Sequence, residues 1–285
     1  MALEKVSTIL KTADKAGYGV AAFNCHNYES IATVINTAEE LKMPVIVMMY
    51  PTVYRHIPVS TFAAITKDLA RKVKVPVGLH LDHSHDFDFI MAAIHEVFQS
   101  VIVDASSFPY AANAGLTRQV VKAAHPMGVD VEAEIGFVGS GANAADYVDS
   151  SKYTDPAEAL RFAEETGVDS LAVAIGNGHG HYAVEPHLDI ERLQAIDELV
   201  PVPLVLHGGS GIPDDQVAAS VAHGMVKFNF GTNYGGSIFA AQERYMADPQ
   251  AKKNSMGLLA AGQAGGKEFV AGRITLLNPK GVTVV

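Results

Sequence analysis

The chain of 285 residues contains a single cysteine, Cys25. One thiol cannot form an intramolecular disulfide, so the composition fits a reducing compartment. A lone cysteine packs more often as a small apolar side chain than it acts as a nucleophile, and we interpret Cys25 in that way.

Long apolar runs and positive charge are also scarce. No apolar segment reaches the roughly 18 residues that a membrane helix needs. Residues 1–5 lack the basic segment and apolar core of a signal peptide. The 21 Lys and Arg residues against 31 Asp and Glu give a net charge of -10, which disfavours non-specific binding to nucleic acid or to an anionic membrane. We therefore expect a cytoplasmic protein that binds neither.

Apolar residues, in contrast, make up 48% of the chain, with a mean hydropathy of +0.15. They recur in eight short runs rich in β-branched residues, at 19–24, 45–50, 77–82, 100–104, 130–135, 170–175, 203–207 and 226–230. Such near-continuous apolar runs, bounded by turn residues, are typical of parallel strands covered on both faces.

Helical patterns fill the intervals between these runs. Residues 28–41 follow a suitable N-cap, Asn27, and residues 157–166 follow Asp155 and Pro156 and end at Gly167. An unbroken alternation of eight strand–helix units favours a (β/α)₈ TIM barrel, an α/β fold, over a doubly wound sheet. No linker divides the chain, so we expect residues 1–285 to form a single domain.

Two segments are longer than ordinary loops. Residues 136–153 are rich in Gly, Ala, Asn and Ser and are expected to form a mobile flap after the fifth strand. Residues 233–285 extend beyond the eighth strand. We expect a closing helix at 237–245 and extended chain at 274–281.

Polar residues gather where the predicted strands end. In a barrel of this kind, chemistry takes place at the carboxyl ends of the strands. The residues found there are Asn24, Asp82, His83, Asp104, Glu134, His179, His207 and Asn229. This placement is the strongest physical indication in the sequence that the protein is an enzyme.

Three of these residues, His83, His179 and His207, suit a metal ion. Three imidazoles with an open fourth position describe a catalytic zinc site, and nitrogen ligands favour Zn²⁺ or Co²⁺ over Mg²⁺. Separately hydrogen-bonded histidines remain the alternative. The competing ligand candidates are His80, His85 and His181, of which His80, in mid-strand, is more simply a core residue.

Asp82 directly precedes His83, and neighbours on a straight strand point in opposite directions. Both side chains reach one site only if the strand ends and turns, which we expect at Ser84. Asp82 is then a candidate acid or base close to the metal.

Glycine clusters follow the last three predicted strands, at 176–180, 207–213 and 229–232. Glycine allows backbone N–H groups to approach an anion, and the loops after strands seven and eight of such barrels often bind phosphate. Tight turns are the alternative. Beside a metal site, the clusters favour a phosphorylated substrate.

At these positions the sequence resembles the class II, zinc-dependent ketose-bisphosphate aldolases of the tagatose- and fructose-bisphosphate type. The matching segments are residues 22–24, 80–83, 103–106, 131–136, 174–176 with 179–180, 207–213, and 227–229 with 232. The resemblance implies reversible cleavage of a phosphorylated ketose into a ketotriose phosphate, dihydroxyacetone phosphate, and an aldehyde. Relatives are commonly dimers or tetramers, which implies a homodimer or homotetramer here.

The resemblance also implies roles for single residues. His83, His179 and His207 would bind one zinc ion, and Asp82 would move the proton of the substrate hydroxyl. Asp104 and Glu134 match positions that bind a second metal or orient the ligands. A monovalent cation, Na⁺ or K⁺, is often near the substrate. The residues expected to bind substrate and phosphate are Asn24, Gly180, Gly208, Gly209, Ser210, Asn229, Gly231 and Thr232.

Some positions depart from the family pattern. The flap lacks the glutamate that relatives use for proton transfer, and Asp146 or Asp149 are the candidates to replace it. Tyr50 stands where Ser or Thr is usual, and Asn177 and Asn233 are also unusual. The tail lacks a familiar Asp-Pro-Arg-x-Tyr stretch.

These departures motivate a second hypothesis, a barrel that binds sugar phosphate with weak or altered aldolase chemistry. A third, a metal-dependent hydrolase, is prompted by the His83-Ser84-His85 pair. It is disfavoured because such enzymes carry the pair on the first strand and an Asp on the eighth.

Overall fold

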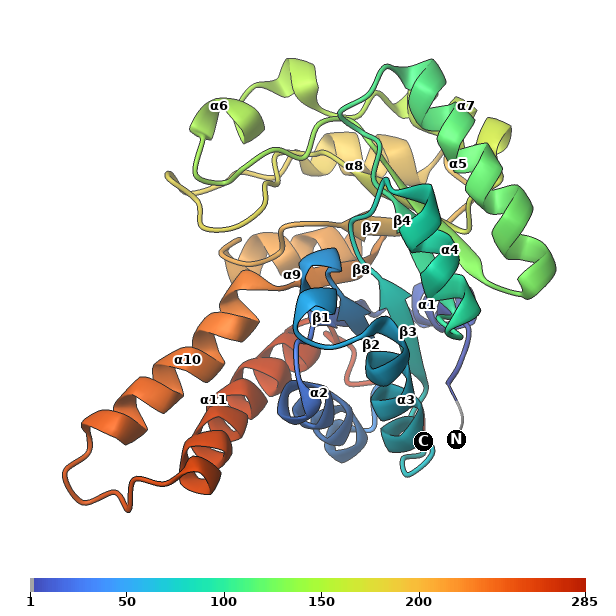
Figure 1. Cartoon of the computed structure of the whole chain (residues 1–285). Helices are drawn as coiled ribbons and strands as arrows, with labels where there is room; N and C mark the ends of the chain where they lie inside the picture. Colours follow the sequence, from blue (N-terminus) through green and yellow to red (C-terminus); the bar gives the residue numbers. More distant parts are fainter. Residues whose placement is uncertain (1–2) are drawn as a thin grey trace.

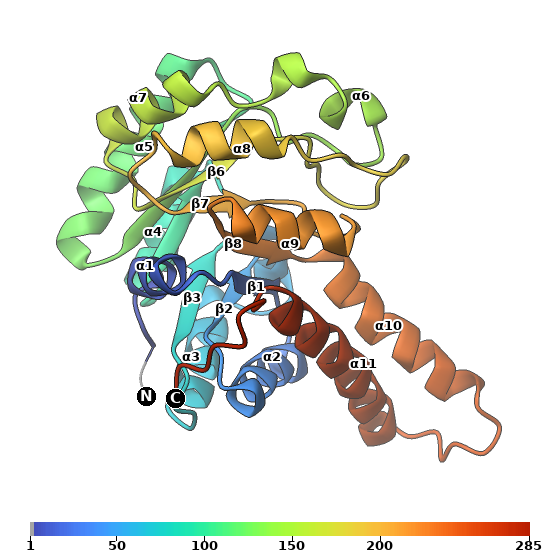
Figure 2. The ribbon, with the colours of Figure 1, turned by 180° about the vertical axis from the view of Figure 1, so that it is seen from behind.

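The computed structural model describes residues 3–285 and contains a closed barrel of eight parallel strands (Figures 1 and 2). Each strand pairs with the next along the chain, and β8 pairs with β1. The strands are β1 (Val20–Asn24), β2 (Val45–Met49), β3 (Val77–Leu81), β4 (Ser100–Val103), β5 (Asp130–Ile135), β6 (Ser170–Val173), β7 (Leu204–Leu206) and β8 (Met225–Phe230). The predicted (β/α)₈ barrel is confirmed.

Helices follow every strand and cover the outside of the barrel. They are α1 (Val6–Ala16), α2 (Tyr28–Leu41), α3 (Val59–Ala70), α4 (Phe87–His95), α5 (Tyr110–Ala124), α6 (Ala144–Tyr147), α7 (Pro156–Thr166), α8 (Ile190–Asp197), α9 (Asp214–Ala222), α10 (Thr232–Ala247) and α11 (Ser255–Leu276). Three 3₁₀ helices complete the set, η1 (Pro51–Arg55), η2 (His125–Met127) and η3 (Ser150–Lys152).

The predicted helix starts have the expected caps. The Asn27 side chain accepts a hydrogen bond from the Ser30 N–H at 2.9 Å, and the Ser30 hydroxyl accepts from the Asn27 N–H. The Asp155 carboxylate likewise accepts from the Glu158 N–H at 2.9 Å. Local sequence therefore sets where α2 and α7 begin, and the barrel sets how they pack.

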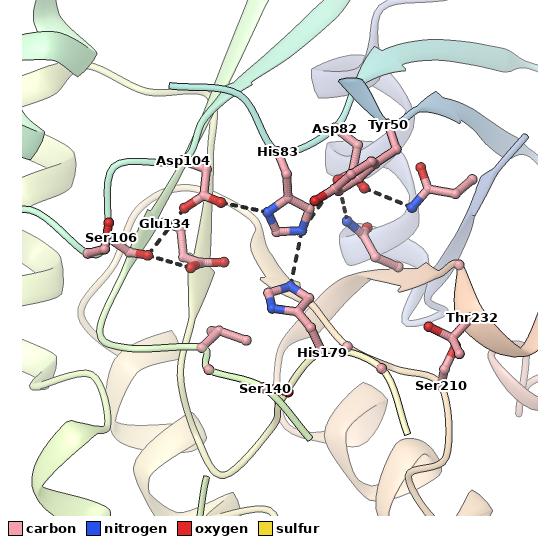
Figure 3. A pocket seen from close by; sticks show the side chains of 18 of the residues that line it. Tyr50, Asp82, His83, Asp104, Ser106, Glu134, Ser140, His179, Ser210 and Thr232 are labelled. Atoms are coloured by element: carbon pink, nitrogen blue, oxygen red, sulfur yellow. Dashed lines mark hydrogen bonds and ion pairs between the residues drawn. The ribbon is translucent and has the colours of Figure 1, made fainter. Parts of the chain in front are cut away.

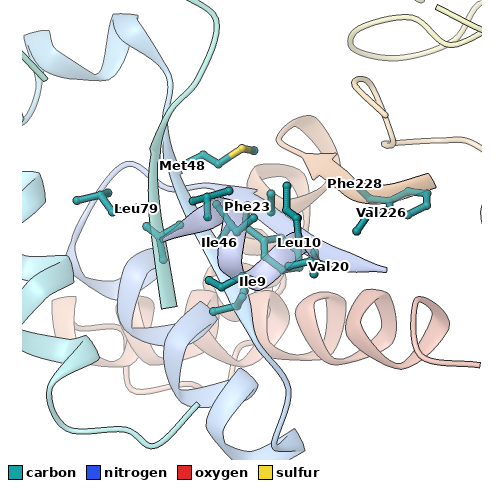
Figure 4. Close-up of a cluster of buried hydrophobic side chains, with 14 of the residues drawn as sticks. Ile9, Leu10, Val20, Phe23, Ile46, Met48, Leu79, Val226 and Phe228 are labelled. Atoms are coloured by element: carbon teal, nitrogen blue, oxygen red, sulfur yellow. The ribbon is translucent and has the colours of Figure 1, made fainter. Parts of the chain in front are cut away.

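The core is the layer of side chains between strands and helices, extended at the amino ends of the strands by α1. Ile9 and Leu10 of α1 are buried beside Val20 and Ile46 of the barrel (Figure 4). The backbone N–H of Glu4 bonds to the carbonyl of Val77, the first residue of β3. The amino end of the barrel is thus covered, which leaves the carboxyl ends of the strands open.

The C-terminal region differs from the prediction. Extended chain was expected at 274–281, but α11 runs to Leu276, so the expectation is wrong for the first part of that segment. The closing helix is also longer than 237–245, because α10 begins at Thr232. Figure 1 shows α10 and α11 as an antiparallel hairpin that projects away from the barrel.

Within residues 3–285, no helix combines the length and the apolar character that crossing a membrane would need.

Candidate active site

The carboxyl ends of the strands surround a cavity of about 710 Å³. It is lined by twelve of the fourteen residues that the sequence analysis proposed for the site. The other two are His207, which is fully buried beneath the cavity, and Gly209, whose N–H bonds to the carbonyl of Asn229. The fold therefore brings together residues that lie more than 200 positions apart in the sequence, from Asn24 to Thr232.

Asp82 and His83 reach one site because the chain turns at His83 itself. His83 has a φ of +40°, in the left-handed region that residues other than glycine seldom adopt. The predicted turn is therefore present, one residue before Ser84. Asp82 continues the line of β3, with its N–H bonded to the carbonyl of Met49. The left-handed residue then directs the imidazole back toward the cavity.

The His83 and His179 rings point their Nε2 atoms toward each other. Their Nε2 atoms lie 3.1 Å apart, with His83 between Asp104 and His179 in Figure 3. Ligand atoms about 2.0–2.1 Å from a tetrahedral zinc ion lie about 3.3 Å from one another, so this spacing suits a shared metal. Ligand atoms of His83, Glu134, His179 and His207 all lie within 4.8 Å of one another. This group, the four-residue cluster, is a fitting donor set for a metal ion.

A carboxylate orients the first of these histidines. Asp104 Oδ2 lies 2.8 Å from His83 Nδ1, which leaves His83 Nε2 to face the cluster. Burial opposes ionisation of Asp104, but the hydrogen bond to His83 and the charges of the nearby histidines together outweigh it and hold the pKa of the carboxyl below its usual value. The Ser106 hydroxyl lies 2.7 Å from Glu134 Oε1 and 3.2 Å from Asp104 Oδ1, and its single proton is shared between these two carboxylates.

His207 is held by carboxylates on both sides of its ring. Nδ1 lies 2.6 Å from Glu134 Oε2, and Nε2 lies 2.9 Å from Glu132 Oε1. Burial alone would lower the pKa of this imidazole, but the bonds to Glu132 and Glu134 outweigh burial and raise it to about 10. His179 lacks such partners, and burial together with His83 lowers its pKa to about 4.

Asp82 is held in place by two amides. Asn24 Nδ2 donates to Asp82 Oδ2 at 2.8 Å, and Asn229 Nδ2 donates to Oδ1 at 3.2 Å. Burial disfavours the charged carboxylate, but the positive charges around it, first His83 and His207 and then Lys227 and His80, together outweigh burial and lower the pKa of Asp82. Asp82 is therefore an ionised carboxylate, 3.8 Å from His83 Nε2.

The glycine-rich loops after β6 and β7 touch each other directly. Gly208 has a φ of +65°, and a Cβ there would lie 2.0 Å from the carbonyl oxygen of Gly178. The Tyr182 hydroxyl joins the two loops, accepting from the Gly178 N–H and donating to the Gly208 carbonyl, each at 2.9 Å. The buried Asn177 amide donates to the His207 carbonyl at 3.0 Å, so this departure from the family pattern fixes the ligand loop.

The remaining histidines are not part of the four-residue cluster. His80 is fully buried, with Nδ1 bonded to Ser100 at 2.8 Å, as expected of a core residue. His85 lines the cavity but packs against Phe108, and His181 is exposed on the surface. These three histidines thus lie outside the group, and the binding of a metal by His83, His179 and His207 stays a prediction.

The segment 136–153 lies against the loop that carries His179. Gly139 and Gly141 exchange backbone hydrogen bonds with His179 at 2.8 and 2.7 Å. The two flap carboxylates are used within the segment: Asp146 pairs with Lys152 at 3.2 Å, and Asp149 caps η3. Neither carboxylate lines the cavity. The mobility of this segment stays a prediction.

Sequence reasoning missed Glu132, Lys227 and Tyr182. Glu132 and Lys227 are fully buried and paired at 2.8 Å inside the barrel. The sequence contains a signal for these two residues, because a charge in the middle of an otherwise apolar strand requires a buried partner. No local pattern indicates the role of Tyr182, which depends on the meeting of two loops.

The family model of class II fructose-bisphosphate aldolase matches residues 4–282. The chain belongs to this family. The YdjI aldolase of Escherichia coli K12 is 33% identical, with 99% of each chain covered and a TM-score of 0.88.

The fructose-bisphosphate aldolase Fba of Campylobacter jejuni, 20% identical, shares the fold, with 97% of this chain and 96% of that chain covered and a TM-score of 0.81.

This class II aldolase is therefore a lyase on a TIM barrel, and metal dependence is a property of its family. The resemblance inferred from the motifs is confirmed. A metal-dependent hydrolase is excluded by the same finding, since family membership covers nearly the whole chain.

Proposed function

We propose that the aldolase reversibly cleaves a phosphorylated ketose into dihydroxyacetone phosphate and an aldehyde, with one Zn²⁺ held by His83, His179 and His207. The observation that supports this most directly is the convergence of the three imidazoles beside an ionised, buried Asp82. Zinc bound there would polarise the ketone carbonyl and stabilise the negative charge that develops on it.

Asp82 is the group we expect to accept a proton from the substrate hydroxyl next to the carbon–carbon bond that breaks. As that proton leaves, the hydroxyl becomes the carbonyl of the aldehyde, and the electron pair of the broken bond stays with the ketotriose phosphate. Asn24 and Asn229 hold the carboxylate in position with two hydrogen bonds. In the direction of synthesis, Asp82 returns the proton.

The phosphate is expected to bind where β8 meets α10. Gly231 and Thr232 line the cavity at the start of a 16-residue helix, and the N–H groups of a helix N-terminus favour an anion. Ser210 lies beside Thr232 across the cavity from Asp104 (Figure 3), and Gly180 and Gly208 also line the cavity. A Na⁺ or K⁺ ion beside the phosphate remains an expectation from the resemblance.

Tyr50 is the group we propose in place of the missing flap glutamate. Its ring centroid lies 6.0 Å from that of His83, and its side chain lines the cavity. Burial, and then the charges of Asp82 and Asp104, raise the pKa of the phenol, so it keeps its proton at neutral pH. A neutral phenol can donate that proton to the carbon left by the cleaved bond.

The decisive experiment is turnover of a panel of ketose 1-phosphates and ketose 1,6-bisphosphates by the zinc-loaded enzyme, with the aldehyde trapped. We expect His83→Ala to lose both tight zinc binding and turnover. His83→Asn is the matched control. It also removes the imidazole, but Asn tolerates the positive φ of this position, so the variant separates loss of the ligand from backbone strain. If His83→Ala retained zinc and turnover, the proposed mechanism would be wrong. Tight binding of every ketose phosphate without cleavage would favour a sugar-phosphate-binding barrel instead.

We also propose that the aldolase is a homodimer or homotetramer in a reducing, cytoplasmic setting. The assembly is supported by apolar side chains exposed on the projecting hairpin, Phe239, Met246 and Met256. Sedimentation of the purified protein tests it.

A further inference from the structure

A charged pair lies inside the barrel, one level below the four-residue cluster. Glu132 of β5 and Lys227 of β8 have no exposed surface, and Lys227 Nζ lies 2.8 and 3.1 Å from the two carboxylate oxygens. The interior of a TIM barrel is ordinarily filled by bulky branched apolar side chains. An ion pair in that position therefore needs an explanation.

Stability is a weak explanation for this pair. Removing two charges from water costs several kcal/mol for each ion, and replacing a buried pair with apolar groups of similar volume is often neutral or stabilising. The explanation is better sought in what the pair contacts. Glu132 Oε1 lies 2.9 Å from His207 Nε2, and Oε2 accepts a further hydrogen bond from Ser170.

This contact determines which nitrogen of His207 is available to a metal. With Nε2–H donating to Glu132, the nitrogen without a proton in the neutral ring is Nδ1. Nδ1 is also the atom that faces the four-residue cluster, because it lies 2.6 Å from Glu134, a member of that cluster. Lys227 neutralises Glu132 and bonds to both of its oxygens, so the carboxylate has a single orientation.

We propose that Glu132 and Lys227 are positioning residues of the metal site, which fix the tautomer and the ring orientation of His207 so that Nδ1 is the ligand atom. The inference rests on the proposed function only in taking His207 as a metal ligand. Residues that hydrogen-bond to a metal ligand typically change metal affinity by 10–100-fold when they are lost.

The test measures zinc affinity of folded protein by competition with a chromophoric chelator. The double variant E132L/K227M replaces the pair with apolar groups and leaves His207 Nε2 without an acceptor. We expect it to fold, with a lower unfolding free energy because the buried Nε2–H loses its acceptor, and to bind zinc 10–100-fold more weakly. E132Q/K227M keeps an amide oxygen for Nε2 without any charge, and we expect it to recover most of the affinity.

S100A is the matched control. It removes a buried hydrogen bond to His80 in the same part of the barrel that does not involve His207. We expect its zinc affinity to stay within threefold of the wild type. Wild-type zinc affinity in E132L/K227M would overturn the proposal, as would an equal loss in E132L/K227M and S100A.

A second measurement uses the wild-type protein, so it does not require that any variant folds. Nitrogen-15 NMR of the zinc-loaded wild type should show His207 protonated at Nε2. Protonation at Nδ1 would overturn the proposal. Neither measurement uses cleavage, so the two proposals can fail separately. If the wild type cleaves no ketose phosphate but E132L/K227M still loses zinc affinity, the proposed function is wrong and this inference stands.

Discussion

The strand ends and the C-terminal hairpin differ in which side chains they bury and which they expose. At the strand ends, polar side chains from different strands bond to one another, as the buried Asp82 does to Asn24 and Asn229. On the hairpin formed by α10 and α11, apolar side chains are exposed, with Met256 72% and Phe239 62% accessible. Helices α10 and α11 pack against each other, and α11 against α2, more than either helix packs against the strands.

The difference shows where each kind of function can be placed. The barrel wall holds the site, so a polar substitution there should change chemistry more than stability. The hairpin lies outside that wall, so a substitution there should change stability or assembly and leave chemistry intact.

The largest effect is expected from Asp82→Asn. The variant has nearly the same shape but cannot accept the hydroxyl proton, so we expect kcat to fall about 10²–10⁴-fold. The fold should tolerate it, because the amide oxygens of Asn24 and Asn229 are buried without partners and can turn to accept from the new amide. Turnover and zinc affinity are measured on the same preparation.

Zinc affinity is the control for this variant, and it should stay close to that of the wild type. A kcat within tenfold of the wild type would show that Asp82 is not the base. A large loss of unfolding free energy would show that the strand ends are not separable from the fold.

The strand ends were predictable from sequence for a physical reason. Strands β3 and β4 end in the apolar residues Leu81 and Val103, so the polar residue after each marks the end of the strand. Asp82 and Asp104 could be located in this way without knowing which strands are neighbours. The parallel alternation of strands and helices then places all such ends on one side of the barrel.

The pair Glu132–Lys227 and helix α11 were not predictable in the same way. Pairing of β5 and β8 side chains across the barrel depends on register, which no local pattern contains. Helix α11 carries five glycines, which weaken a helical pattern, and its long final stretch of mixed apolar residues resembles extended chain. Four of the five, all but Gly272, lie close against α10, and a Cβ at Gly265 would lie 2.5 Å from that of Ala241.

The next effect is the dependence of zinc affinity on pH. The pKa of His207 is raised from its ordinary value of 6.5 to about 10, so in the metal-free protein the ring keeps its second proton, and its positive charge, between those pH values. The ligand must be neutral, so zinc has to displace that proton, and its affinity should rise about tenfold per pH unit between pH 7 and 9.

The same shift has a consequence for the metal-free fold. The stability contributed by charged His207 is fully present below pH 6.5 and is lost as the pH rises through about 10. Chelator competition at several pH values, corrected for zinc hydrolysis, checks the first expectation. An affinity independent of pH would contradict it.

A smaller effect is expected within the hairpin from Gly265→Ala. The added Cβ would lie 2.6 Å from the Ser237 carbonyl oxygen, so α10 and α11 must move apart, at a cost of about 1–3 kcal/mol in unfolding free energy. Gly272→Ala, in the same helix with no atom within 4 Å of the new Cβ, is the control. We expect it to stabilise by up to about 1 kcal/mol. Denaturant unfolding gives both values, and kcat should be unchanged in each folded variant.

The smallest effect on fold and chemistry is expected from Met256→Lys near the tip of the hairpin. Met256 is 72% exposed, so the unfolding free energy of the single chain should change by less than about 0.5 kcal/mol. Zinc affinity and kcat at saturating substrate should match the wild type. If copies of the chain associate through the hairpin, a buried lysine charge should lower the sedimenting mass at a given concentration. An unchanged mass, with the wild type already an oligomer, would place the interface elsewhere and would remove the hairpin from any role in assembly.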